Sequence, residues 1–234
     1  MRMTTMRILQ EYAMVGMNNH FKDPDKSLAA DMQSLDKSLQ EMIDSFKSRK
    51  DRQDYGYAFL LDAQTKLKKA KKILRTKVSK ENALAFWKAV DGVRDALNKS
   101  LAHLSQEVYP DDEIAQGIMY ANRLSTIAQR FGALYLYKVW GFDKELHADK
   151  QLAFLSTFFP DAVDNVAESA EELPKATQKR VNKSLQGVKR NIMFFVIMGK
   201  SSHRFIPTLI YDKAEKIAES ANRIAELFLK AEAS

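Results

Sequence analysis

Residues 209–228 read LIYDKAEKIAESANRIAELF, a stretch in which apolar side chains recur at intervals of three and four positions. This spacing places the apolar side chains on one side of an α-helix and the charged side chains on the other. The stripe consists of Leu209, Ile210, Ala214, Ile217, Ala221, Ile224 and Phe228. The rest of the chain follows the same period, and no segment shows the apolar–polar alternation of a β-strand between turn signals. We therefore expect an all-α fold.

Turn-forming residues divide the chain into eight expected helices. The breaks are placed at residues 18–25, 48–54, 76–80, 109–111, 141–143, 174 and 199–207. Ser79 stands where a helix N-cap is expected, because its hydroxyl can accept a hydrogen bond from a free amide of the first turn. Gly141 after Trp140 stands where a helix is expected to stop.

An internal repeat organises these helices. The sequence DKSLAAD at residues 25–31 matches DKELHAD at residues 143–149 in five of seven positions. Upstream, residues 6–17 align with residues 129–140, so that Arg7 pairs with Arg130 and Tyr12 with Tyr135, and the second copy is five residues shorter in between. Two matches in the same order indicate a duplication. We expect two tandem four-helix-bundle-like modules, 1–108 and 110–234, joined at Tyr109-Pro110.

Composition excludes several classes of protein. The chain has 234 residues, 45% of them hydrophobic, which is enough for an ordinary core, and it contains no cysteine. Thiolate zinc sites, iron–sulfur clusters and cysteine nucleophiles are therefore excluded, and the lack of thiols slightly favours an oxidising compartment. The longest apolar run, residues 192–198, is far shorter than the roughly 20 residues of a membrane-spanning helix.

No catalytic signature is present. Nucleophile elbows, phosphate-binding glycine loops, paired zinc-binding histidines and kinase motifs are all missing from the sequence. Asp143 and His147 lie four residues apart and would share one helix face, but nothing else in the sequence converges on them, so a surface pair is the simpler interpretation of these two residues. We expect no enzyme activity, no metal and no cofactor.

The two repeated helices carry a resemblance to a known family. ANRLSTIAQRFGALYLYKVWG, residues 121–141, resembles the signature helix of the PilJ-type domain, the amino-terminal domain of type IV pili methyl-accepting chemotaxis transducers, whose signature reads approximately A-G-R-Q-R-M-L-S-Q-R. The matching positions are Ala121, Arg123, Gln129 and Arg130, and the departures are Asn122, Leu124, Ser125, Thr126 and Ala128. The first copy matches through Arg2, Met3 and Arg7. The stretch from residue 191 to 228 resembles the closing helices of that domain through His203, Arg204, Phe205, Pro207 and Leu209.

The resemblance implies an extracytoplasmic sensor domain related in character to nitrate and nitrite sensors. It implies a small anion or metabolite as ligand, a membrane receptor or signalling partner, a homodimer, and a periplasmic location behind a leader or membrane helix. The ligand-binding candidates are Arg7, Arg123, Arg130 and Tyr135. Arg123 and Arg130 are seven residues apart and so lie on nearly one helix face, and guanidinium groups offer forked donors to planar oxyanions.

Two alternatives to ligand binding remain open for these residues. An arginine on an otherwise apolar helix is commonly paired with a carboxylate of a neighbouring helix, which would give Arg7 and Arg130 structural roles. The aromatic residues would line a pocket between helices or, as their spacing suggests, form the core. They are Tyr12, Tyr135, Tyr137, Phe86, Trp87, Trp140, Phe194 and Phe195.

One stretch supplies the positive charge of the chain. Residues 66–80, KLKKAKKILRTKVSK, contain eight Lys and Arg and no acid, and subtracting these eight from the total of 37 leaves 29 basic against 30 acidic residues. Leu60, Leu67, Ala70, Leu74 and Val78 form one apolar stripe, so we expect the charges to point outward. They form either a solvated face or a surface for an anionic polymer or membrane, with Lys68, Lys69, Lys72 and Arg75 as its candidates. Nucleic acid is disfavoured, because the stretch has no aromatic residue to stack on bases.

Overall fold

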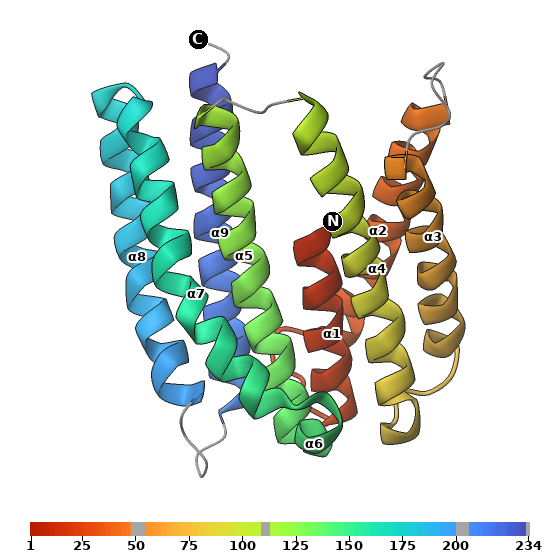
Figure 1. Cartoon of the computed structure of the whole chain (residues 1–234). Coiled ribbons are helices and arrows are strands. Elements are labelled where there is room, and N and C mark those ends of the chain that lie inside the picture. The colour runs from red at the N-terminus through yellow and green to blue at the C-terminus, as the bar shows by residue number, and fades with distance from the viewer. Residues whose placement is uncertain (48–54, 109–112, 200–205, 233–234) are drawn as a thin grey trace. The chain divides into compact units, whose positions relative to one another are not determined.

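The computed structural model describes residues 1–47, 55–108, 113–199 and 206–232, and these residues form helices and no strand. The expected all-α class is confirmed. The chain divides into two compact units, Met1–Pro110 and Asp111–Ser234, which are described separately (Figure 1).

Unit 1 contains four long helices that pack in a ring (Figure 1). They are α1 (Arg2–Gly16), α2 (Pro24–Lys47), α3 (Tyr55–Leu74) and α4 (Lys80–Val108). α1 and α3 each pack against both α2 and α4. Inside the ring Tyr12 of α1 stacks on Phe86 of α4 with ring centroids 4.0 Å apart, and both side chains are buried. This stacked pair joins the first helix of the unit to the fourth.

Polar side chains cross the other seams of unit 1. The buried hydroxyl of Ser100 in α4 donates to the backbone carbonyl of Gly56 in α3 at 3.0 Å. The ammonium group of Lys71 in α3 lies 2.8 Å from the carboxylate of Asp36 in α2. The buried hydrogen bond of Ser100 helps to set the register of α4 against α3, because a shifted helix would leave this hydroxyl unsatisfied.

Unit 2 also has four long helices in a ring, with two short segments between the first and the second (Figure 1). The elements are α5 (Glu113–Tyr137), the π-helical turn η1 (Lys138–Phe142), α6 (Asp143–Leu146), α7 (Ala148–Ser169), the 3-10 turn η2 (Ala170–Glu172), α8 (Lys175–Gly199) and α9 (Pro207–Glu232). α5 and α8 each pack against both α7 and α9. The order of helices around the ring is therefore the same as in unit 1.

Aromatic side chains occupy the core of unit 2. Phe131 of α5 stacks on Phe195 of α8 at 4.6 Å, and Phe159 of α7 lies 6.1 Å and 5.9 Å from these two rings. At the seam between α5 and α9, a Cβ atom added to Gly117 would lie 2.3 Å from the ring of Phe228. Gly117 therefore allows the buried ring of Phe228 to lie directly on the backbone of α5.

The stripe predicted on the last helix is confirmed. Leu209 is half-buried, and its other six members are buried within α9. The helix begins at Pro207, which lacks the amide hydrogen that would be unsatisfied at a first helical position.

Most of the expected breaks between helices lie within the described residues. Gly141 has φ of 102°, a left-handed conformation that interrupts the path from α5 to α6. α3 ends at Leu74, so Val78, expected to continue its apolar stripe, lies instead in the connection to α4. The breaks at residues 48–54 and 109–111 and most of that at 199–207 lie outside the described residues.

Candidate functional site

Arg7 lies on α1 and is held by carboxylates. Its guanidinium group donates two hydrogen bonds to the two carboxylate oxygens of Asp31 in α2, and its Nε lies 3.9 Å from Oε1 of Glu11. The side chains of Asp31 and Glu11 are 12% and 1% exposed, so these contacts are well shielded from water. This is the structural pairing considered for Arg7 as the alternative to ligand binding. An anion would have to compete with Asp31 for the same donors.

Arg123 and Arg130 both face α7. The guanidinium group of Arg123 lies 5.9 Å from the centre of the Phe158 ring, and Arg130 donates a hydrogen bond of 3.0 Å to the side-chain oxygen of Gln151. The two arginines are seven residues apart on α5, and their partners Phe158 and Gln151 are seven residues apart on α7 in the reverse order. This is the pattern of two antiparallel helices in constant register. The two arginines therefore share a seam, as their spacing predicted, but each contacts a different residue of α7.

Gln151 ties Arg130 to the end of the preceding helix. Its side-chain nitrogen donates to the backbone carbonyl of Leu146 at 2.6 Å, while its side-chain oxygen accepts from Arg130. The amide thereby links the guanidinium of Arg130 to the backbone at the end of α6. We name the surface formed by Arg123, Arg130, Gln151 and Phe158 the α5–α7 seam.

Tyr135 does not join the arginines. It lies five residues beyond Arg130, about 140° around the helix, and its side chain is 1% exposed. Its hydroxyl oxygen accepts a hydrogen bond of 3.1 Å from the backbone amide of Ile206, directly before α9 begins. Burial raises the pKa of Tyr135, and the backbone of Ile206 and the charge of Lys138 oppose this. The structure thus gives Tyr135 an anchoring role.

Tyr12 occupies the equivalent place in unit 1. Burial also raises the pKa of its phenol, and the nearby backbone of Ser79, directly before α4, lowers it. In both units the aligned tyrosine of the first helix therefore lies near the backbone that leads into the fourth helix.

The aromatic candidates for a ligand pocket belong mainly to the core. All except Phe194 are buried, and Phe194 is half-buried. Tyr137, Trp140 and Phe142 pack edge-on or tilted around the turn between α5 and α6, with centroid distances between 5.4 and 5.8 Å. These contacts fit the core interpretation of the spacing.

Asp143 and His147 serve the junction between α6 and α7. A carboxylate oxygen of Asp143 accepts a hydrogen bond of 3.1 Å from the backbone amide of Asp149, and His147 has the left-handed φ of 48°. Within the described parts of the chain, no three His, Asp or Glu residues are grouped closely enough to hold a metal ion.

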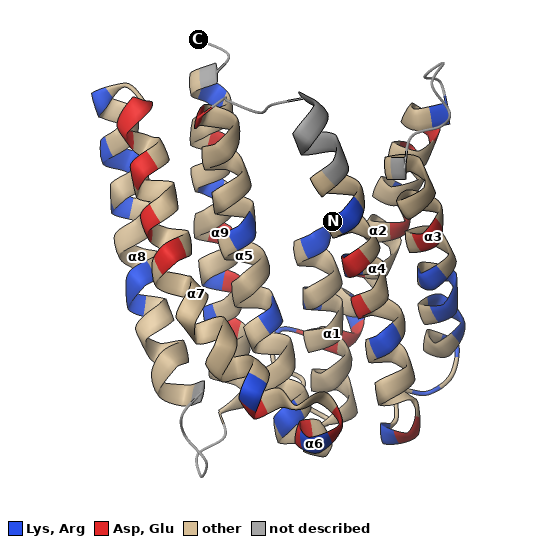
Figure 2. Ribbon diagram, in the orientation of Figure 1, with Lys and Arg blue, Asp and Glu red and all other residues tan. Residues whose placement is uncertain are grey.

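The basic residues of α3 point away from the core of unit 1. Leu60, Leu67 and Ala70 are buried, while the four candidate cations Lys68, Lys69, Lys72 and Arg75 are exposed. We name these four the α3 basic face; Arg75 directly follows the last helical residue. Figure 2 shows basic positions gathered along the C-terminal half of α3.

The α3 basic face differs from the other lysines of the helix in its partners. Lys66 pairs with Asp62 at 2.6 Å, and Lys71 pairs with Asp36 at 2.8 Å. Among the described residues, no ion pair involves any member of the α3 basic face. The face consequently presents uncompensated positive charge to solvent.

A second basic helix was missed by the sequence reasoning. α8 carries six Lys and Arg residues and no Asp or Glu. The net charge of the chain does not reveal this helix, because acidic residues elsewhere in the chain balance its positive charge. A count of acid-free helical segments, rather than of net charge, would have found α8.

Comparison with known proteins yields no relative: no family model, no curated protein and no solved structure matches the chain. The similarity to the PilJ-type domain therefore stays a prediction, and three of the residues that carry it, His203, Arg204 and Phe205, lie outside the described residues. In the described portion of the chain, every helix is too short or too polar to cross a bilayer.

Proposed function

We propose that the protein is a non-enzymatic helical module that binds an anionic polymer through the α3 basic face. The observation that carries this proposal is the exposure of Lys68, Lys69, Lys72 and Arg75 on the outward side of a well-packed helix, without ion pairs among the described residues. Charges of one sign on a rigid helix raise the local concentration of a polyanion and release its counterions on binding.

The spacing of these cations suits a linear chain of negative groups. Lys68 and Lys72 are four residues apart, about 6 Å along the axis of α3, and Arg75 follows directly after the end of the helix. Lys68 and Lys72 lie on the same side of the helix, and Lys69 lies on the flank. Because the stretch has no aromatic residue between Lys66 and Lys80, a polymer without bases, such as polyphosphate or an anionic polysaccharide, fits better than nucleic acid.

The test is titration of the full chain with fluorescently labelled polyphosphate at low ionic strength. Replacing Lys68 and Lys72 by Gln should weaken binding about tenfold, since two exposed charge contacts are lost. The control is Lys37→Gln with Lys47→Gln, which removes the same charge from α2, where both lysines lie near acids of their own helix. Equal loss in both variants would reduce the effect to net charge and would contradict the proposal.

A second candidate function, small-anion sensing, is favoured by the α5–α7 seam. The observation behind it is that Arg123 and Arg130 face the same neighbouring helix, one over the Phe158 ring and the other on the neutral amide of Gln151. A planar oxyanion binding there would exchange the Gln151 bond for a charged one. A shift of α7 against α5 would then carry the signal to a membrane receptor or a second copy of the chain in the periplasm.

A thermal-shift screen tests the sensing candidate. Nitrate, nitrite and small carboxylates are added to the full chain, and one of them should raise the melting temperature in the wild type but not in Arg130→Ala or Arg123→Ala. Arg223→Ala, which removes an exposed arginine near Glu219 on α9, is the control and should keep the response. No response to any anion, or a response that survives both seam substitutions, would contradict this candidate.

A further inference from the structure

α8 carries an unusual concentration of positive charge. Its six cations are Lys175, Lys179, Arg180, Lys183, Lys189 and Arg190, and no acid lies on the helix. Lys175, Lys179 and Lys183 follow one another at intervals of four residues, so like charges are neighbours on one face and repel each other. An anionic partner would relieve this repulsion.

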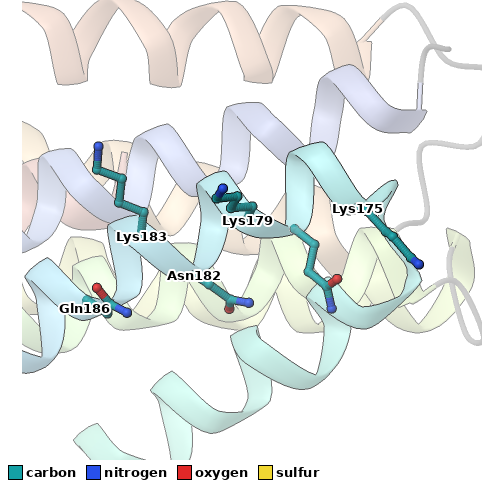
Figure 3. Close-up of a pocket in the computed structure, with 6 residues that line it drawn as sticks. Lys175, Lys179, Asn182, Lys183 and Gln186 are labelled. Atoms are coloured by element: carbon teal, nitrogen blue, oxygen red, sulfur yellow. The ribbon is translucent and has the colours of Figure 1, made fainter.

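Five of these cations are available to a partner. Lys189 lies 4.0 Å from Asp164 of α7, but within the described residues no ion pair involves the other five. Figure 3 shows the outward side of α8, where a shallow depression is lined by Lys175, Gln178, Lys179, Asn182, Lys183 and Gln186. All six belong to α8, so the depression is open to a large flat partner rather than enclosed for a small one.

The same side of α8 ends in two exposed apolar residues. Met193 and Ile197 are 65% and 64% exposed, the two largest values among the large apolar residues of the described chain. Eighteen residues make five helical turns, so Met193 lies directly in line with Lys175, and Ile197 with Lys179, about 27 Å further along the axis. Cations and apolar side chains therefore form one continuous outward stripe.

The opposite side of α8 accounts for the stability of the helix. Val181, Leu185, Val188, Ile192 and Phe195 are buried against the rest of unit 2. Met193 and Ile197 therefore contribute nothing to this core, and exposing them to water has a free-energy cost. A partner that covers them would recover that free energy.

We propose that the outward stripe of α8 binds the surface of an anionic lipid bilayer, with Lys175, Lys179, Lys183 and Arg190 at the lipid phosphates and Met193 and Ile197 inserted among the acyl chains. A helix that lies in the membrane interface uses this combination of basic and apolar side chains. A phosphate polymer would use the cations but leave the apolar pair exposed. This surface is separate from the α3 basic face in sequence and in its apolar content.

The neighbouring helix restricts how the bilayer is approached. α7 exposes Asp161, Asp164 and Glu168, which an anionic surface repels. The edge shared by α7 and α8 is therefore unfavourable for contact. The stripe centred on Lys179 and Met193 is the part of α8 that meets the lipid.

The experiment is a flotation assay with the full chain and two kinds of vesicle, phosphatidylcholine alone and phosphatidylcholine with about one quarter phosphatidylglycerol. The wild type should bind only the anionic vesicles. Met193→Ser with Ile197→Ser should lower that affinity about tenfold or more, because two apolar insertions are lost, and should leave polyphosphate binding unchanged. Phe154→Ser on α7 is the control, since this side chain is 63% exposed but lies off the stripe.

Three results would overturn the proposal. They are no binding to anionic vesicles, binding that is unchanged in the Met193 and Ile197 double variant, and polyphosphate binding that falls together with vesicle binding. The double variant is also measured in the Lys68→Gln, Lys72→Gln background. A tenfold loss there supports the α8 stripe even if the α3 proposal fails. If circular dichroism shows that the double variant is unfolded, Ile197→Ser alone replaces it.

Discussion

Residues 25–31 lie within one continuous helix, α2 of unit 1, whereas the matching residues 143–149 of unit 2 form α6, a left-handed residue and the start of α7. The break falls at His147, which aligns with Ala29. In unit 1, residues 17–23 connect the first two helices. In unit 2, the stretch between the two matching segments of the repeat is five residues shorter. In unit 2 the repeated segment itself therefore supplies part of the turn.

The break in unit 2 changes the partner of the aligned arginine. In unit 1 Asp31 faces Arg7 and accepts two hydrogen bonds from it. The corresponding Asp149 instead accepts a hydrogen bond from Lys138, and Arg130 meets Gln151, two residues further along α7. A repeated pair of sequence positions thus does not keep its contact when the connection between its helices changes length.

The contact between the first and fourth helices survives the change. Tyr12 and Tyr135 both lie near the backbone directly before the fourth helix, and the hydroxyl of Tyr135 accepts a hydrogen bond there from Ile206. This contact does not depend on the connection between the first and second helices, so the shorter turn of unit 2 leaves it intact. The two units therefore share the seam between the first and fourth helices, called the conserved seam below. They differ at the seam between the first and second helices, called the altered seam.

The largest expected effect concerns the seam between the first and fourth helices of unit 2. Gly117→Ala places a methyl group 2.3 Å from the buried ring of Phe228 and should lower the free energy of unfolding by up to about 3 kcal/mol. Gly187→Ala on α8 is the matched control, because its added methyl group meets nothing within 4 Å. Chemical denaturation should show a gain of up to about 1 kcal/mol there. Equal effects at both glycines would contradict the described packing of α5 against α9.

The altered seam is tested by the two aligned aspartates. Asp31→Asn should destabilise the protein by about 1.5 to 3 kcal/mol, because the charged hydrogen bonds to Arg7 are largely shielded from water. Asp149→Asn should cost at most about 1 kcal/mol, because that carboxylate is 59% exposed. Denaturant midpoints compare the two variants. A larger loss for Asp149→Asn would reverse the comparison.

The conserved seam is tested by removing the hydroxyl of Tyr135. Tyr135→Phe should cost about 0.5 to 1.5 kcal/mol in thermal or chemical unfolding, because it removes the buried hydroxyl that accepts a hydrogen bond from the backbone amide of Ile206. Tyr57→Phe, at a half-buried position of α3, is the control and should change little. If Tyr135→Phe behaved like Tyr57→Phe, the contact with Ile206 would contribute nothing to stability, and this part of the account would be wrong.

The two aligned tyrosines predict a pH dependence. Burial raises the pKa of Tyr12 and Tyr135 above the ordinary value of 10.0, so both phenols stay protonated in the folded protein where they ionise in the unfolded chain. The stability that they contribute is complete below pH 10 and is lost as the pH rises through the raised pKa values. Urea denaturation above pH 10 should show a steeper fall for the wild type than for the double Phe variant. Identical slopes would contradict the buried state of the phenols.

The smallest effect tests the break itself. His147→Gly should stabilise the protein by up to about 1 kcal/mol, because a left-handed residue without a Cβ atom avoids steric strain. Ala29→Gly should destabilise it by about 0.5 to 1 kcal/mol, because Ala29 lies inside α2. Opposite signs at two aligned positions would confirm that the repeat folds in two ways, and equal signs would contradict it.

The fold class and the outward direction of the α3 cations follow from periodicity, and the repeat follows from self-comparison. The break at His147 was not predicted, because the repeat aligns this residue with Ala29 inside a helix, and the sequence match alone does not show that the second copy turns here. The roles of Tyr135 and Arg130 also depend on tertiary register. Tyr135 binds the backbone of Ile206, 71 residues away, and a sequence pattern shows side-chain types but not backbone partners.

The α3 basic face and the α8 stripe teach a related lesson about charge. The α3 basic face could be predicted because it accounts for the net charge of +7. The basic residues of α8 were missed because acidic residues elsewhere in the chain balance them in the net charge. Which cations are exposed and unpaired depends on the register of neighbouring helices. The sequence therefore predicts where basic residues gather but not which of them remain available to a partner.

The most direct test of the proposed function is the salt dependence of polyphosphate binding. If the α3 basic face contacts the polymer, the logarithm of the association constant should fall linearly with the logarithm of the salt concentration, and Lys68→Gln with Lys72→Gln should reduce that slope by about 1.5 to 2. The Lys37→Gln, Lys47→Gln control should keep the wild-type slope. A slope that is the same in all three proteins would contradict binding through α3.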